Sequence, residues 1–153
     1  MGTPTHTSTV SGRRMRRLAT VLGGSAALSL AIAPSAFAEG NFSSSISGAA
    51  TGFNSRWWDD RNQDSSDTVI KFTGCTTTSG PAFKSVTVQL TRYRPVISDV
   101  NEGQKTFTAC ANGGTSTGNW GRKQAAEYRF ALMKINGSSS GHWMSVRTVG
   151  VWY

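Results

Sequence analysis

The sequence predicts an all-β fold, a single antiparallel β-sandwich domain of about six to seven strands with one disulfide. No helical spacing of apolar residues persists after Glu39; short β-branched and aromatic runs alternate there with clusters of Gly, Ser, Asn and Asp. Residues 39–153 are enough for one domain with a real core. Cys75 and Cys110 are the two cysteines, and in an exported chain such a pair is most simply a disulfide.

The first 38 residues have the parts of a secretory signal peptide. Four arginines within residues 13–17 precede an apolar run, residues 18–33, and Ala36-Phe37-Ala38 puts small residues at the −3 and −1 positions of a cleavage site. The run is short for a membrane span. We expect export by the general secretory route rather than the twin-arginine route, and cleavage after Ala38. The product is then expected to be an extracellular chain without a membrane anchor. Leader and composition are typical of a bacterial exported protein.

Loss of this leader changes the charge balance. It removes four of the sixteen Lys and Arg residues and none of the eight acidic ones, so the net charge falls from +8 to +4. A mildly basic chain has some affinity for anionic surfaces, although ordinary solubility explains the same charge. No nucleic-acid-binding motif is visible, and we expect no nucleic acid partner.

Strands are expected wherever an apolar or β-branched run lies between turn residues. In chain order they fall near residues 42–49, which is the weakest, and then near 53–58, 68–73, 83–93, 105–111, 127–135 and 142–152. Period-two alternation gives the faces: Val86, Val88 and Leu90 point one way, and Tyr128, Phe130 and Leu132 do the same in their own strand.

Turns and cysteines suggest how these strands connect. Asn136-Gly137 tolerates positive φ, which predicts an antiparallel hairpin between the last two strands. A change of parity predicts a bulge near Gly150. Cys75 and Cys110 each end a predicted strand, so their bond would tie two strand ends and stabilise the fold by roughly 4 kcal/mol. A metal site would need further ligands, and we expect neither metal nor cofactor.

Trp57 and Trp58 are adjacent in a predicted strand and must point to opposite faces. Trp57 shares its face with Phe53 and is assigned to the core, which leaves Trp58 as the more exposed indole. An exposed indole stacks on sugar rings, and Arg56 on the same face would orient the ligand. The alternative is that Trp58 packs beneath a loop or that Arg56 covers it.

Trp120 is the stronger candidate for ligand binding. It lies beside Asn119 and Arg122, between two glycines, in an expected loop whose backbone could approach a ligand closely. The alternative is a hydrophobic plug that pins this loop onto the sandwich edge. The sequence does not separate the two.

Three catalytic or metal-binding patterns fail on their details. Residues 59–67 resemble a calcium loop but lack its glycine and closing glutamate. Two matches to G-x-S-x-G, residues 114–118 and 137–141, lead into no helix and cannot form a nucleophile elbow. His142, Glu127 and Arg129 are the types of base, acid and cation that a small secreted ribonuclease needs, but His142 and Glu127 are expected far apart. We therefore favour a protein that is not an enzyme.

The leading hypothesis is a secreted, non-catalytic binding protein whose ligand is a polysaccharide or the cell envelope, with Trp120 and Trp58 as stacking platforms. The second is a protein-directed factor, an enzyme inhibitor or an antimicrobial, toxin-like protein, that presents residues 98–104 or 112–121 to an extracellular protein. A small secreted hydrolase is the third.

Overall fold

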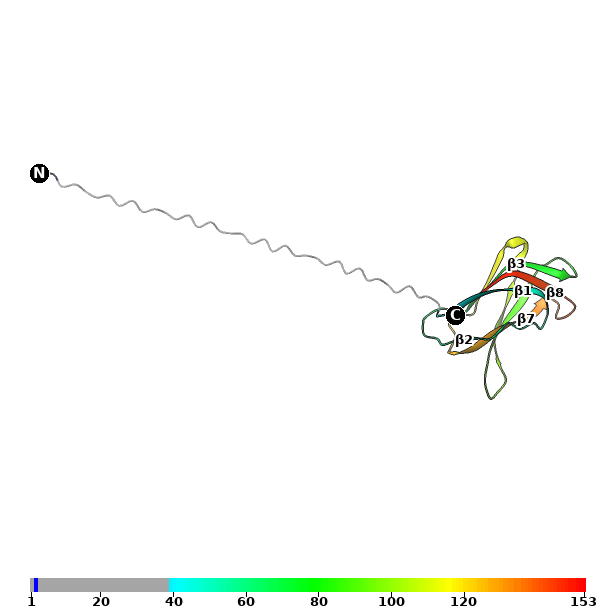
Figure 1. Cartoon of the computed structure of the whole chain (residues 1–153), viewed down its shortest axis with the longest axis horizontal. Helices are drawn as coiled ribbons and strands as arrows, with labels where there is room; N and C mark the ends of the chain where they lie inside the picture. Colours follow the sequence, from blue (N-terminus) through cyan, green and yellow to red (C-terminus); the bar gives the residue numbers. More distant parts are fainter. Residues whose placement is uncertain (1, 3–38) are drawn as a thin grey trace. The chain divides into compact units, whose positions relative to one another are not determined.

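The computed structural model describes Gly2 and residues 39–153, and these residues form an all-β domain (Figure 1). The predicted signal peptide and its cleavage site lie, apart from Gly2, outside the described residues. Of the residues described, none belongs to a helix that is long and apolar enough to cross a membrane. Among the described residues, the strands, the disulfide and the core all lie within residues 39–153.

Eight strands form two antiparallel four-stranded sheets. Sheet A has the order β1-β8-β3-β6 and sheet B the order β2-β7-β4-β5. A short 3-10 turn, η1 (Ala111–Gly113), precedes β6. The strands are β1 (Asn41–Ala50), β2 (Trp58–Asp60), β3 (Val69–Ser79), β4 (Val86–Arg92), β5 (Val100–Phe107), β6 (Thr115–Asn119), β7 (Ala126–Ile135) and β8 (Trp143–Trp152).

The connections alternate between the sheets. Only β4 and β5 are consecutive strands paired in one sheet, which is the strand order of an eight-stranded jelly roll. The predicted hairpin of the last two strands is therefore wrong, because β7 belongs to sheet B and β8 to sheet A. Asn136 and Gly137 do adopt positive φ, and Ser138 N–H donates to Ile135 C=O (3.0 Å). Such a turn reverses the chain without deciding which sheet the next strand joins.

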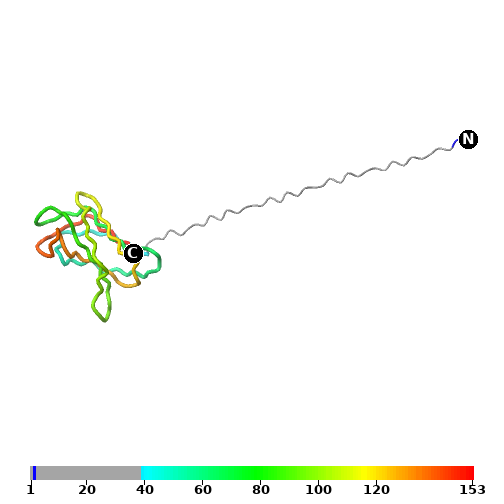
Figure 2. Tube along the Cα trace, turned by 180° about the vertical axis from the view of Figure 1, so that it is seen from behind, coloured from blue at the N-terminus to red at the C-terminus, as the bar shows by residue number. Residues whose placement is uncertain are grey.

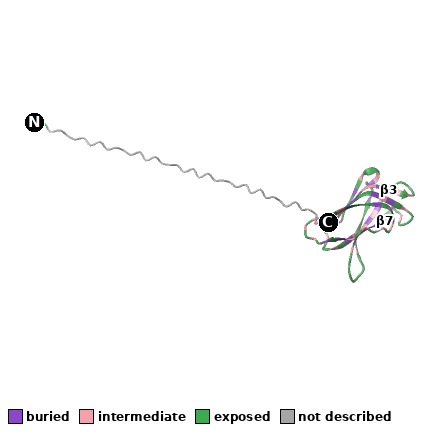
Figure 3. Ribbon diagram, in the orientation of Figure 1, coloured by how far each residue is buried: buried purple, intermediate pink, exposed green. Residues whose placement is uncertain are grey.

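The core fills the space between the sheets (Figure 3). The predicted inward faces of residues 86–90 and 128–132 are confirmed, since their alternate apolar side chains are fully buried. Sheet A adds Phe72, whose ring packs edge-on against Phe107 (5.0 Å between centroids) and Phe130 (5.5 Å). The aromatic contacts join the two sheets across the sandwich.

The prediction for Trp57 and Trp58 is wrong. Residues 53–57 contain one isolated bridge, Asn54 to Ala131, and regular pairing starts only with Trp58 opposite Tyr128. Parity therefore does not carry from Phe53 to Trp57. Trp58 is only 5% exposed, and Trp57 lies on the outer side of sheet B.

Two other strand predictions also need correction. β5 begins five residues before the expected strand at 105, so most of residues 98–104 is strand rather than loop. Residues 112–121, expected as a loop, contain β6. Small residues are required there, because a Cβ on Gly118 would lie 2.7 Å from ring atoms of both Phe107 and Trp120.

The disulfide between Cys75 and Cys110 is present as predicted. Cys75, however, lies inside β3 rather than at its end, next to Gly74, which has positive φ. Cys75 N–H donates to Cys110 C=O (2.6 Å). The bulge predicted near Gly150 instead involves residues 147–148, which face Ser45 of β1.

The loops gather at two ends of the sandwich (Figures 1 and 2). At the disulfide end lie loops 80–85, 108–114 and 136–142 and the start of segment 51–57, which then runs along β7 to β2. At the terminal end Gly40 and Tyr153 exchange backbone hydrogen bonds (2.9 and 3.0 Å), and beside them lie loops 61–68, 93–99 and 120–125.

Candidate functional site

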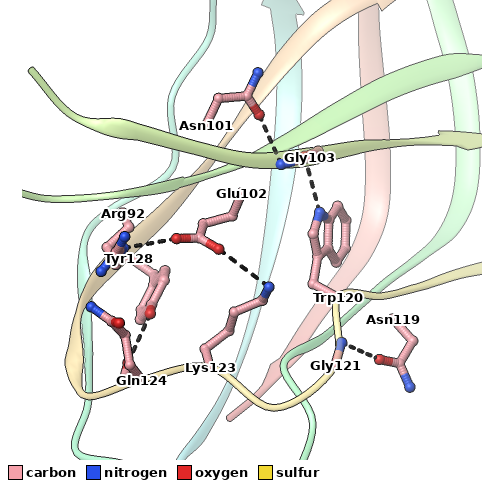
Figure 4. Close-up of polar contacts among 10 residues, drawn as sticks. All are labelled: Arg92, Asn101, Glu102, Gly103, Asn119, Trp120, Gly121, Lys123, Gln124 and Tyr128. Atoms are coloured by element: carbon pink, nitrogen blue, oxygen red, sulfur yellow. Dashed lines mark hydrogen bonds and ion pairs between the residues drawn. The ribbon is translucent and has the colours of Figure 1, made fainter.

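Trp120 is built into the terminal end of the molecule (Figure 4). Its side chain is 7% exposed and packs against Phe107 (6.5 Å between centroids). Its indole N–H donates to Gly103 C=O (3.0 Å), and its backbone N–H donates to Thr68 C=O (2.9 Å). This is the geometry of the plug alternative: the indole pins loop 120–125 onto β5.

Asn119 and Arg122 form hydrogen bonds with neighbouring residues at the terminal end of the sandwich. Asn119 donates to Asp67 (2.8 Å) and accepts from Gly121 N–H (2.6 Å). The Arg122 Nε donates to the side-chain oxygen of Asn62 (2.7 Å). Together they tie loop 120–125 to loop 61–68.

Trp58 and Arg56 belong to an aromatic cluster. The Trp58 ring lies 5.7 Å from Phe42, 6.0 Å from Tyr153 and 6.4 Å from Tyr128 between centroids. The Arg56 guanidinium carbon lies 4.0 Å from the centre of the Phe42 ring. A ligand role for these residues and for the Trp120 group stays a prediction, but neither indole offers an open face for stacking.

Exposed indole surface lies instead on the outer face of sheet A. Trp143, at the start of β8, is 51% exposed, and Trp152, at its other end, is partly exposed. Trp152 covers Gly150, where a Cβ would lie 2.3 Å from the ring, and Lys71 Nζ lies 4.8 Å from the ring centre. Alternation in this strand could have identified Trp143 as exposed, because Met144 and Val146 of the same strand face the core.

The same face is hollowed between these two indoles. A shallow depression of about 420 Å³ lies where Gly74 and the bulge at 147–148 interrupt the sheet; hydroxyl, amide and guanidinium groups line it, from Ser45, Thr76, Asn112, Ser145 and Arg147. The Arg147 side chain crosses two glycine backbones: a Cβ on Gly74 would lie 3.2 Å from its Nε, and one on Gly113 would lie 3.7 Å from its Nη2.

Charge is segregated along the sandwich. All eight carboxylates of the chain lie at the terminal end or in the loops beside it: Glu39, Asp59, Asp60, Asp64, Asp67, Asp99, Glu102 and Glu127. All four ion pairs of the described residues are there as well. The other half carries cations alone, Lys84, Lys105, Lys134 and Arg147. Arg147 forms no ion pair with any described residue.

A second hollow opens at the terminal end. Loop 93–99 projects from the body (Figure 2), and a cleft of about 550 Å³ separates it from residues 124–127. Val96 is 90% exposed and Ile97 58%. The wall opposite the loop is held by Tyr128, whose hydroxyl donates to Gln124 C=O (2.7 Å), and by Glu102, which pairs with Arg92 (2.7 Å) and Lys123 (3.3 Å; Figure 4).

Two buried groups at this end have shifted pKa values. Burial raises the pKa of the Tyr128 hydroxyl, and the nearby negative charge of Glu102 adds to the effect. Burial also raises the pKa of Asp60, with Glu39 beside it as a further cause. Both groups are used structurally, Tyr128 as the anchor of Gln124 and Asp60 as an acceptor for Asn62 N–H (2.9 Å).

The residues considered for catalysis or metal binding are dispersed. His142 lies at the disulfide end against Gly80, whereas Glu127 lies opposite Asp59 in the register of β7 and β2 at the terminal end. Among residues 39–153, no three His, Cys, Asp or Glu side chains gather as a metal site requires.

Comparisons with known proteins identify no family for this chain. No family model, no curated protein and no solved structure matches it.

Proposed function

We propose that this chain is an exported, non-catalytic binding protein whose ligand is an acidic polysaccharide of the cell envelope or extracellular matrix. The observation that carries the proposal is the depression around Arg147 on the outer face of sheet A. Its volume, about 420 Å³, suits one or two sugar units rather than a buried cofactor.

The chemistry of the depression favours a hydroxylated anion. Hydroxyl and amide side chains donate to and accept from sugar hydroxyls. The Arg147 guanidinium offers a fork of donors to a carboxylate, sulfate or phosphate group. Its side chain lies along Gly74 and Gly113 and has no carboxylate partner in residues 39–153, so its charge is available to a ligand.

Trp143 supplies the apolar part of such a site. It lies on the same face as the depression, and its ring is half exposed, so that a sugar ring of a chain crossing the face can stack on it. An indole and polar groups on one surface fit an amphipathic ligand better than a purely apolar one.

The positive charge of the surrounding surface also favours an anionic ligand. The half of the sandwich that bears the depression has four cations and, among the described residues, no carboxylate. A surface of one sign raises the local concentration of a polyanion and speeds its association, more so at low salt.

Retention of residues 39–153 on polygalacturonate, with cellulose, chitin and peptidoglycan in parallel, tests the proposal. We expect binding to the acidic polymer that weakens as salt rises. Arg147→Ala should weaken it about tenfold, because a charge-assisted hydrogen bond is lost, and Trp143→Ala should weaken it by a similar factor. Arg61→Ala, which removes the same charge at the terminal end, is the matched control.

Three results would contradict the proposal. Failure to bind any of the four polymers rejects glycan binding, and equal retention on cellulose and polygalacturonate rejects an acidic ligand. Equal weakening by Arg147→Ala and Arg61→Ala rejects the site, because net charge alone would then explain retention.

Contact with a protein is the second candidate, favoured by the exposed apolar tip of loop 93–99. Binding of a short acidic oligosaccharide by Val96→Asp separates the two candidates. Residue 96 lies away from sheet A, so this variant should bind the oligosaccharide as the wild type does if sheet A holds the glycan.

A further inference from the structure

Large exposed apolar side chains concentrate in one place on this molecule. Of the four in the described residues, Tyr93 (43% exposed), Val96 (90%) and Ile97 (58%) belong to loop 93–99, and Trp143 is the fourth. Three exposed apolar side chains within five residues that line one cleft mark a candidate interaction surface.

Both ends of the loop are tied to the body of the domain. Tyr93 N–H donates to Glu127 C=O (2.8 Å), and Arg94 N–H donates to the Asp99 carboxylate (3.4 Å). The same carboxylate pairs with Arg129 (3.4 Å), whose guanidinium carbon lies 4.3 Å from the centre of the Trp57 ring. Anchored ends reduce the conformational entropy that the loop loses when it binds.

A concave surface lies directly beside this convex one. The cleft between the loop and residues 124–127 measures about 550 Å³ and includes apolar surface from Ala125 and Ala126. Trp120 and the ion pairs of Glu102 fix the wall that carries these residues. The projecting tip and a receptor of matching character therefore belong to the same end of the same chain.

Charge gives the second half of the complementarity. Arg94 and Glu127 both line the cleft, both are exposed, and neither takes part in an ion pair within residues 39–153. A two-fold axis at this end pairs each of them with its opposite on the other copy, because a two-fold interface uses the same patch twice.

We propose that the chain forms a two-fold dimer through the terminal end. The Pro95–Ile97 tip of each copy enters the cleft of the other, and Arg94 of each copy pairs with Glu127 of the other. This interface is separate from the depression around Arg147. Its success or failure is independent of the polysaccharide proposal.

Sedimentation velocity of residues 39–153 over a range of concentrations tests the dimer. We expect reversible association to twice the monomer mass. Val96→Asp should weaken it about tenfold or more, because an unpaired carboxylate is costly in an apolar cleft. Lys134→Glu reverses a positive charge at the far end of β7 and should leave association unchanged. It is the control for Arg94→Glu, which makes the same charge reversal at the proposed interface.

A mixture of two variants gives the sharpest test. Arg94→Glu and Glu127→Arg should each remain monomeric alone, because each homodimer would oppose two pairs of like charges. Mixed together they should dimerise, because both contacts of the heterodimer are then between opposite charges. A wild-type chain that stays monomeric at its highest soluble concentration overturns the proposal, and so does a mixture that fails to associate while the wild type dimerises.

Discussion

The two ends of this sandwich are built by different means. The terminal end has all the carboxylates and all the ion pairs of the described residues, together with buried Trp58, Trp120 and Tyr128. The disulfide end has a covalent bond and glycine turns instead, and its charges are cations alone. The same eight-stranded core thus supports one end that carries every ion pair of the described residues and one that carries cations without an ion pair.

This difference separates positions that bind from positions that hold the fold. Indoles occur at both ends: Trp58 and Trp120 are buried at the terminal end, where Trp152 is partly exposed, and Trp143 is open to solvent at the disulfide end. A residue type suited to ligand binding is therefore no guide to a site until its exposure is known. Three changes test the contrast, beginning with the largest expected effect.

Trp120→Ala and Trp143→Ala remove the same side chain from opposite ends. Trp120→Ala should lower the free energy of unfolding by about 3–5 kcal/mol, because a buried indole and its hydrogen bond to Gly103 are lost. Trp143→Ala should change it by about 0.5 kcal/mol or less. Urea unfolding followed by circular dichroism measures both. Similar losses in the two variants would mean that the contrast between the ends is wrong.

Removal of the disulfide should affect the disulfide end first. Replacing Cys75 and Cys110 together with alanine should lower the free energy of unfolding by about 3–4 kcal/mol, because the unfolded chain gains freedom. Amide hydrogen exchange should then rise in residues 108–114 more than in residues 120–125, which Trp120 and the ion pairs hold. Equal acceleration in the two loops would show that the bond supports the whole sandwich evenly.

Sequence patterns predicted the parts of this fold that obey a local rule. The inward faces of residues 86–90 and 128–132 follow from alternation, because each segment lies within a strand and one side of it meets the core. The same rule failed for Trp57 and Trp58, since the chain before Trp58 is not part of a strand. Alternation held inside the strands, even across a register shift between β4 and β7, and failed outside them.

The remaining errors depend on contacts between distant residues. β6 has the composition of a loop in part because Gly118 must leave room for Phe107 and Trp120. The turn at residues 136–137 has hairpin chemistry but connects two sheets. The depression around Arg147 joins β1, β3, β8 and η1, and nothing local in the sequence brings them together.

The smallest expected effect concerns the acidic, terminal end. Asp60 is 5% exposed, and burial, with Glu39 beside it, raises its pKa above the ordinary 3.8. A raised pKa means that the folded state favours the protonated carboxyl, so this contribution to stability is present below pH 3.8 and is lost as pH rises through the folded-state pKa. Asp60→Asn keeps an acceptor for Asn62 N–H and removes the charge. It should therefore be more stable than the wild type at neutral pH, and the advantage should shrink as the pH falls toward 3.8.

Urea midpoints across this range measure the difference, and Asp59→Asn, on the exposed side of the same strand, corrects for net charge. An advantage that stays constant with pH would show that burial does not shift the pKa of Asp60, and one that grows on acidification would show that the folded state favours its charged form.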